Sequence, residues 1–282
     1  MKITTLIEND RADDSSELIA EWGLSLHIEF GNHIILFDTG QSGAFADNAE
    51  RLNVDISSVQ TTVLSHYHFD HGGGLKRFFD LNSKSKVYLA ESSNVECYAR
   101  ACKLVKRYIG LDANILSDFS DRFVFVSEAT EILPNVFVFP KILNNHPKPI
   151  GNKRLYLKKG GKLVLDDFSH EIVMAIKDDD GLVIFTGCSH NGLLNMVDTV
   201  TEKFKGVPIK AIIGGFHLVS SPLFNSMAGS RQEVEELGKS VLNYPVDMTF
   251  TCHCTGKKAF EVLKSVMDNQ LTEIKTGSCF EI

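Results

Sequence analysis

Positively charged residues are scarce in this sequence relative to negatively charged ones. Its 282 residues include 29 Lys and Arg but 36 Asp and Glu, which gives a formal net charge of −7. A protein that binds nucleic acid in general needs surplus Lys and Arg to neutralise phosphates. This charge balance therefore argues against general nucleic-acid binding. A small-molecule substrate is expected, and a local basic pocket for a phosphorylated one stays open.

The sequence also lacks long apolar runs and a cysteine framework. No apolar run approaches the ~20 residues that span a bilayer, and the N-terminus shows no signal-peptide pattern. The six cysteines are scattered through the chain, which favours reduced thiols in the absence of an export signal. We expect a cytoplasmic protein without membrane contact, and the sequence does not indicate its oligomeric state.

What is present is an ordinary globular composition, with 43% hydrophobic and 23% charged residues. Hydrophobic periodicity predicts two strand-rich halves with helices, an α/β protein. Strands are expected at 24–30, 33–38, 61–64, 86–90, 123–126, 136–139, 171–177, 181–186, 209–213 and 247–251. Helices are expected at 75–81, 94–109, 193–204, after a Ser230–Glu233 capping box, and around 260–267. We expect one domain, 1–282, whose less regular region 92–170 forms a cap over the substrate.

The densest polar cluster lies in Ser65–Gly74. It places His66, His68, Asp70 and His71 within six residues, and imidazole and carboxylate are natural ligands of zinc and similar divalent metals. His66 and His68 point the same way in an extended segment, and Asp70 with His71 can face a second ion. The glycines that follow allow a tight turn and close approach to a ligand. The pattern predicts a metal site rather than a solvated loop.

Three further histidines follow predicted strands and precede predicted helices. They lie in Cys188-Ser189-His190, Gly214-Gly215-Phe216-His217 and Cys252-His253-Cys254. Ligands in α/β sheets bind outside the carboxyl ends of the strands. We therefore expect all four histidine-bearing junctions to converge on one edge of the core.

The residues at these junctions receive different roles. His190 and His253 are predicted metal ligands, and His217, which follows two glycines, is predicted to contact substrate. Cys188 is either a ligand or a small buried residue. Asp38 is expected to orient the histidine loop by accepting hydrogen bonds. The remaining histidines are expected to be structural or at the surface: His27, His33, His146 and His170.

These motifs resemble those of the metallo-β-lactamase superfamily. The resemblance rests on His66-x-His68-x-Asp70-His71 preceded by Leu36-Phe37-Asp38-Thr39-Gly40, and it extends over most of the chain. Further matching segments are Glu21–Ser25, Thr186–His190, Gly214–His217 and His253–Gly256. The set is most similar to the dihydropteroate-synthase-related branch, which includes a synthase that joins a dihydropterin to a ribosyl-aminobenzene phosphate.

The resemblance implies an αββα sandwich with one or two metal ions at one edge. It implies that His66, His68 and His190 hold one ion, and that Asp70, His71 and His253 hold the second. Zinc is the expected metal, with manganese or iron as alternatives. Many members bridge the two ions with an aspartate where this chain has Cys188, and the usual separate third-motif histidine is not obvious, so His190 stands in for it.

Three functions follow as alternatives. The leading one is a metal-dependent hydrolase, in which metal-bound water ionises near neutral pH and Asp70 acts as the catalytic residue that orients the water or moves its proton. The second is a transferase of the pterin-pathway type that forms a C–N bond, with phosphate contacts from the cap. The third is a metal-containing sensor or binding protein. Candidate phosphate contacts in the cap are Lys141, Lys148, Lys153 and Arg154.

Overall fold

The protein forms two compact units, which we describe separately. The computed structural model describes residues 1–12, 17–92, 95–101, 105–221 and 226–282. The first unit contains residues 1–127, 154–171 and 274–282, and the second contains residues 128–153 and 172–273. No helix among the described residues is both long and apolar enough to cross a membrane.

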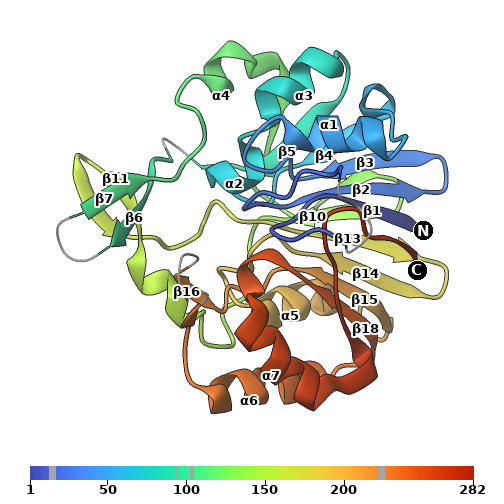
Figure 1. Ribbon diagram of the computed structural model, residues 1–282, viewed down its shortest axis with the longest axis vertical. Helices are drawn as coiled ribbons and strands as arrows, with labels where there is room; N and C mark the ends of the chain where they lie inside the picture. Colours follow the sequence, from blue (N-terminus) through green and yellow to red (C-terminus); the bar gives the residue numbers. More distant parts are fainter. Residues whose placement is uncertain (13–16, 93–94, 102–104, 222–225) are drawn as a thin grey trace. The chain divides into compact units, whose positions relative to one another are not determined.

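The first unit is built on a seven-stranded mixed sheet with the order β20-β1-β2-β3-β4-β5-β8. Strands β3, β4, β5 and β8 run parallel, which places their carboxyl ends at one edge. Helices α1 and α3 cover one face (Figure 1), where Phe45 and Phe78 are fully buried. The strands are β1 (Lys2–Ile7), β2 (Ser25–Phe30), β3 (His33–Phe37), β4 (Thr61–Val63), β5 (Lys86–Ala90), β8 (Phe123–Val126) and β20 (Cys279–Glu281). The helices are α1 (Ala44–Arg51), α2 (Phe69–Gly72), α3 (Leu75–Leu81) and α4 (Ile115–Asp118).

A smaller four-stranded sheet in the same unit corrects one prediction. The helix expected at 94–109 is wrong: apart from residues outside the described ranges, this segment forms β6 (Cys97–Ala101) and β7 (Val105–Tyr108). The sheet order is β12-β11-β6-β7, with β11 (Leu155–Lys159) pairing antiparallel to β6. β12 spans Lys162–Leu165. A partner strand more than 50 residues away thus overrides a local helical periodicity.

The second unit contains another seven-stranded sheet, with the order β19-β18-β15-β14-β13-β10-β9. Its strands β14, β15, β18 and β19 run parallel. Helices α5, α6 and α7 contribute apolar faces to its core, including Val197, Val234 and Leu263. The strands are β9 (Thr130–Leu133), β10 (Val136–Phe139), β13 (Val173–Asp178), β14 (Gly181–Phe185), β15 (Ile209–Gly214), β18 (Val246–Thr251) and β19 (Leu271–Glu273), with β16 (Val219–Ser221) and β17 (Ser226–Met227) forming a separate pair. The helices are α5 (Leu193–Lys203), α6 (Arg231–Val241) and α7 (Lys257–Met267).

The predicted capping box at the start of α6 is confirmed. The Ser230 hydroxyl accepts a hydrogen bond from the Glu233 backbone N–H, and the Ser230 N–H donates to Glu233 Oε2 at 2.6 Å. We expect Ser230→Ala to lower the free energy of unfolding by about 1 kcal/mol, because the helix end loses its side-chain acceptor. Urea unfolding measures this change. Ser240→Ala, within the same helix, is the matched control, and an equal effect of the two substitutions would contradict the assignment.

Candidate metal centre

The histidine loop follows β4, and Asp38 follows the neighbouring strand β3. Because the two strands are parallel, their carboxyl ends meet at one edge of the sheet. Asp38, His66 and His71 are fully buried, and His68 is 4% exposed. Buried polar side chains require hydrogen-bond partners, and here the partners define which ring nitrogens carry protons.

A chain of hydrogen bonds ends on the Asp38 carboxylate. His71 Nδ1 lies 2.6 Å from Asp38 Oδ2, and the Ser65 hydroxyl donates to the same oxygen at 2.7 Å. The Ser65 oxygen, 2.9 Å from His66 Nδ1, must then accept a proton from that ring. Both His66 and His71 therefore carry their proton on Nδ1 and keep a lone pair on Nε2. This arrangement is the one that metal ligation through Nε2 requires.

His66 and His68 turn their remaining nitrogens toward each other. His66 Nε2 lies 3.0 Å from His68 Nδ1. Two nitrogens bound to one tetrahedral zinc ion, at Zn–N distances of about 2.0–2.1 Å, are separated by roughly 3.3 Å. Burial lowers the pKa of His68 to about 3, so its ring is neutral at pH 7. The donor types and their separation fit a divalent metal ion such as zinc.

Asp70 is fixed by the indole of Trp22. Trp22 Nε1 donates to Asp70 Oδ2 at 2.9 Å, and the same oxygen lies 4.0 Å from His71 Nε2. The Asp70 side chain is 10% exposed. This carboxylate therefore has a defined orientation next to the ring nitrogen that His71 keeps unprotonated.

Backbone packing requires the glycines that follow the histidines. The sequence instead predicts that they allow close approach to a ligand. Gly73 and Gly74 have ordinary backbone angles, with φ of −66° and −80°. A Cβ on Gly73 would lie 2.2 Å from the Gln41 carbonyl oxygen, and one on Gly74 would lie 2.3 Å from that of Thr39. Only glycine lets this turn pack against the loop that carries Asp38.

In the second unit, β14, β15 and β18 are adjacent parallel strands, so the segments after them meet at one sheet edge. The rings of His190 and His217 lie 4.1 Å apart between centroids. Candidate ligand atoms of Cys188, His190 and His217 lie within 4.8 Å of one another, as do those of Cys188, His253 and Cys254. Three of the four junctions expected to converge thus lie together in this unit, although His217 leads into β16 rather than directly into a helix.

His190 is oriented by a residue that sequence reasoning missed. Its Nδ1 lies 3.0 Å from Asn152 Oδ1, and Asn152 Nδ2 donates to the His190 carbonyl at 2.7 Å. The amide oxygen can only accept, so His190 Nδ1 carries the proton and Nε2 keeps its lone pair. Asn152 lies just after a breaker-rich loop, and no local pattern connects it with His190, 38 residues away.

Cys254 is a second residue without an assigned role in the sequence. Burial raises the pKa of its thiol, but hydrogen bonds that involve Cys188 and His217 outweigh this effect and lower it well below the usual thiol value. The His217 backbone N–H donates to Cys254 Sγ at 3.3 Å. The Cys254 sulfur, beside Cys188 and His253, adds a soft donor to the histidines of this unit.

Backbone strain marks the same junctions in both units. Asp38, Ser189, His217 and His253 adopt the left-handed region, with φ between 49° and 61°. Residues with a Cβ rarely occupy this region, and strained backbone of this kind clusters at functional sites. Ser189, His217 and His253 lie within segments that carry candidate ligands, and Asp38 orients His71.

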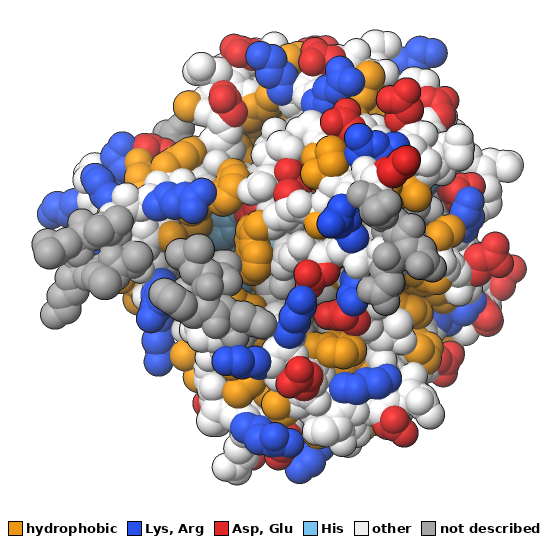
Figure 2. Space-filling model, viewed as in Figure 1, with side chains coloured by type: hydrophobic (Ala, Val, Ile, Leu, Met, Phe, Trp, Pro, Cys, Tyr) orange, Lys and Arg blue, Asp and Glu red, His pale blue; other side chains and the backbone are white. Residues whose placement is uncertain are grey.

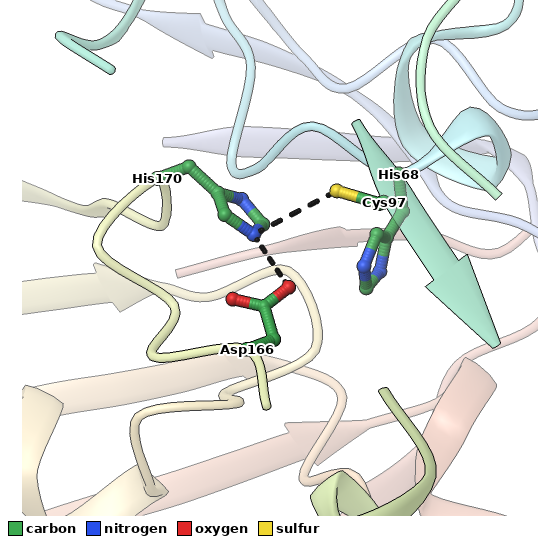
Figure 3. Close-up of side chains that lie close together, drawn as sticks. All are labelled: His68, Cys97, Asp166 and His170. Atoms are coloured by element: carbon green, nitrogen blue, oxygen red, sulfur yellow. Dashed lines mark hydrogen bonds and ion pairs between the residues drawn. The ribbon is translucent and has the colours of Figure 1, made fainter. Parts of the chain in front are cut away.

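A buried cluster behind the histidine loop was not predicted. Figure 3 shows His170 between Cys97 and Asp166, with His68 beside them. His170 Nε2 lies 3.1 Å from Asp166 Oδ2 and 3.9 Å from Cys97 Sγ, and both the His170 and Asp166 side chains are fully buried. Candidate ligand atoms of the four residues lie within 4.8 Å of one another.

Hydrogen bonding decides the chemistry of this cluster. The backbone N–H of Tyr67 donates to His170 Nδ1 at 3.3 Å, which requires a lone pair there and a proton on Nε2. Burial lowers the pKa of His170, but hydrogen bonds to Asp166 and Cys97 raise it to about 10. A doubly protonated ring could not accept the hydrogen bond from the Tyr67 N–H. We therefore favour the neutral ring. With Nε2 donating to Asp166, His170 anchors the backbone between His66 and His68 rather than binding a metal.

Two of the cap lysines contact side chains of the same chain. Lys148 Nζ donates to Asn191 Oδ1 at 2.7 Å, and Lys141 pairs with Glu128. These contacts leave phosphate binding by either lysine as a prediction.

Comparison with known proteins identifies relatives of the whole chain. The family model described as the metallo-beta-lactamase superfamily matches residues 23–189. A 7,8-dihydropterin-6-methyl-4-(beta-D-ribofuranosyl)-aminobenzene-5'-phosphate synthase of Methanocaldococcus jannaschii is 31% identical over 293 residues, covering 98% of this chain and 95% of its own.

Solved structures agree in fold. A metal-dependent hydrolase of the beta-lactamase superfamily matches with a TM-score of 0.82 and 29% identity, over 100% of this chain and 99% of its own. Zinc-bound PqqB from Methylobacterium extorquens matches with a TM-score of 0.58 and 10% identity over the full length of both chains. The layered α/β fold expected from the motifs is confirmed.

Proposed function

Because this chain belongs to the metallo-beta-lactamase superfamily, we propose that it is a metal-dependent hydrolase acting on a phosphorylated small molecule. The observation that carries the proposal is the hydrogen-bond chain from Asp38, which leaves His66 and His71 with a lone pair on Nε2. A histidine that served only packing would not need its proton held on Nδ1 by a buried carboxylate.

The proposed ligand sets are those implied by the family. His66, His68 and His190 hold one divalent ion, and Asp70, His71 and His253 hold a second, with zinc as the proposed metal and manganese or iron as alternatives. Cys188 is a candidate ligand in place of the bridging aspartate, which its proximity to His253 and Cys254 supports. We retain a cytoplasmic location and the cap role of residues 92–170 as proposals.

The residues around the metal divide the chemistry between them. A bound divalent ion supplies a Lewis acid and lowers the pKa of water toward 7. Asp70, held by the Trp22 indole, orients the attacking water and accepts its proton. His217 has a buried Nδ1 with no hydrogen-bond partner in the described part of the chain, and we assign it to the substrate. Burial of these groups keeps their charges from being screened by bulk water.

A second candidate function is transfer rather than hydrolysis. The Methanocaldococcus jannaschii relative is named as a synthase whose product carries a dihydropterin, an aminobenzene and a ribosyl phosphate. By this alternative the metal would polarise phosphate oxygens of a leaving group, and the attacking group would be an aromatic amine or ring rather than water. A sensor that binds ligand without turnover is the third alternative.

Turnover in ¹⁸O-labelled water distinguishes these functions. With a phosphodiester or diphosphate ester as substrate, we expect one labelled oxygen per cleaved bond in the product, because water is the nucleophile. Mass spectrometry of the product measures it, and metal-stripped protein is the control. Product that forms only with an aromatic acceptor and carries no label would favour transfer, and tight binding without turnover would favour the sensor.

A further inference from the structure

The small sheet of the first unit carries a row of three tyrosines on adjacent strands. Tyr98 of β6 lies opposite Tyr108 of β7 and Tyr156 of β11 in the strand register. Residues opposite each other in neighbouring strands project from the same face. The rings of Tyr98 and Tyr108 meet edge to face, 5.4 Å apart between centroids. The three rings therefore form a continuous aromatic row across β7, β6 and β11.

Cationic side chains border this row on the same face. Arg100 lies opposite Lys106 in the register, two residues along from the tyrosines. The Arg100 guanidinium lies 5.0 Å from the Tyr156 ring centroid, and Lys106 Nζ lies 5.9 Å from that of Tyr98. Lys158, two residues beyond Tyr156, borders the row and pairs with Glu96. Stacking on the tyrosines holds Arg100 and Lys106 at defined positions.

The local charge contrasts with that of the whole chain. The strands of this sheet contain no Asp or Glu, and the chain overall has a net charge of −7. Glu96, directly before β6, is the one acidic residue among those described that contacts the row: it accepts a hydrogen bond from the Tyr98 hydroxyl at 3.0 Å and pairs with Lys158. Figure 2 shows Lys and Arg side chains gathered at its left edge, where Figure 1 places β6, β7 and β11. On the tyrosine face the cations are Arg100, Lys106 and Lys158, whereas Arg107, Lys159 and Lys162 project from the other face. Among described residues, neither Arg100 nor Lys106 has an acidic partner.

The two faces of the sheet have opposite environments. Cys97 and Leu157, which project from the other face, are 0% and 3% exposed and belong to the apolar core. On the tyrosine face Lys106 is exposed, Tyr108 is 40% exposed, and Leu165, opposite Tyr156, is 62% exposed. The tyrosine face is thus exposed along β7 and at Leu165 and half-buried at Tyr98, Arg100 and Tyr156. The metal-loop residue His68 lies with Cys97 on the buried side.

We propose that the tyrosine face binds single-stranded nucleic acid. Bases would stack on the tyrosines, and phosphates would meet Arg100 and Lys106, the combination used by stacking platforms on β-sheets. An open face of repeated aromatic and cationic positions suits an extended chain of phosphates better than a single small molecule, which needs an enclosed pocket. The acidic remainder of the protein limits binding to this patch and makes it sensitive to salt.

Fluorescence anisotropy with labelled ten-nucleotide oligo(U) and oligo(dT) tests this proposal. We expect binding that weakens with salt, with a log–log slope of about −1.4 for two neutralised phosphates on a single strand. Arg100→Ala/Lys106→Ala is expected to weaken binding at least tenfold and to reduce the slope. Lys203→Ala/Lys205→Ala, which removes the same charge at the end of α5, is the matched control and leaves binding within about twofold.

The stacking contribution is tested separately at Tyr156. Tyr156→Ala is expected to weaken binding by about 5-fold to 100-fold, whereas Tyr156→Phe retains the ring and stays within about twofold. Circular dichroism verifies that each variant is folded. Equal weakening in the two double variants, or no binding to folded wild-type protein at low salt, would overturn the proposal. If adenosine monophosphate binds as tightly as the oligonucleotides, the tyrosine face is a small-ligand site instead. If the protein binds only anionic lipid vesicles, the tyrosine face is a membrane-binding surface instead.

Discussion

Replacing His68 by alanine removes bound metal and reduces turnover to the background rate. His68 Nδ1 faces His66 Nε2 at 3.0 Å, so the substitution deletes one of two facing donors. The remaining ligands cannot complete the coordination that a catalytic zinc ion needs, three protein ligands and one open position. Metal content per chain, measured on protein purified without added metal, and turnover of the same samples give the result.

Matched substitutions separate the proposed ligands from other histidines. We expect two metal equivalents in the wild type, with one lost in His190→Ala and the other in His253→Ala. His33→Ala is the control, because His33 lies at the start of β3 and away from the histidine loop. Full activity in a metal-free His68→Ala protein would refute the metal-dependent mechanism. One metal equivalent in the wild type that His253→Ala retains would indicate a single ion. It would also mean that Cys188 does not replace the bridging aspartate of other family members.

Replacing His170 by alanine weakens metal binding by about 10-fold to 100-fold, although His170 is not a ligand. Its Nδ1 accepts from the backbone N–H of Tyr67, the residue between His66 and His68, while its Nε2 donates to Asp166. Without the imidazole, the histidine loop loses the contact that fixes its backbone. Competition with a chelator measures the zinc affinity of each variant.

A loss of affinity must be distinguished from a general loss of stability. His170→Ala also leaves a buried carboxylate and a backbone N–H without their partner, which costs about 1–3 kcal/mol for each group. His170→Gln is the conservative variant, since its amide can accept from Tyr67 and donate to Asp166, and we expect it to recover most of the affinity. If the metal-free His170→Ala protein is destabilised while its zinc affinity is unchanged, His170 has only a packing role.

Sequence periodicity predicted most strands and helices because their patterns are local. The strands at 24–30, 33–38 and 86–90 and the helix at 75–81 occur in the structure with ends shifted by at most one residue. The segment 94–109 failed because its apolar spacing fits a helix, whereas its backbone pairs with β11, more than 50 residues away. Pairing over such a distance leaves no trace in a short window.

The sequence by itself determined which residue types stand at the ends of the strands, since His66, His68, Asp70 and His71 fall within six residues and a strand precedes them. Only the tertiary structure decided where their protons lie. Asp38 reaches His71 across 33 residues, Asn152 reaches His190 across 38, and His170 reaches the Tyr67 backbone across 103. Hydrogen bonds depend on distance and angle in space, so these partners became identifiable only once the sheets had brought the strand ends together.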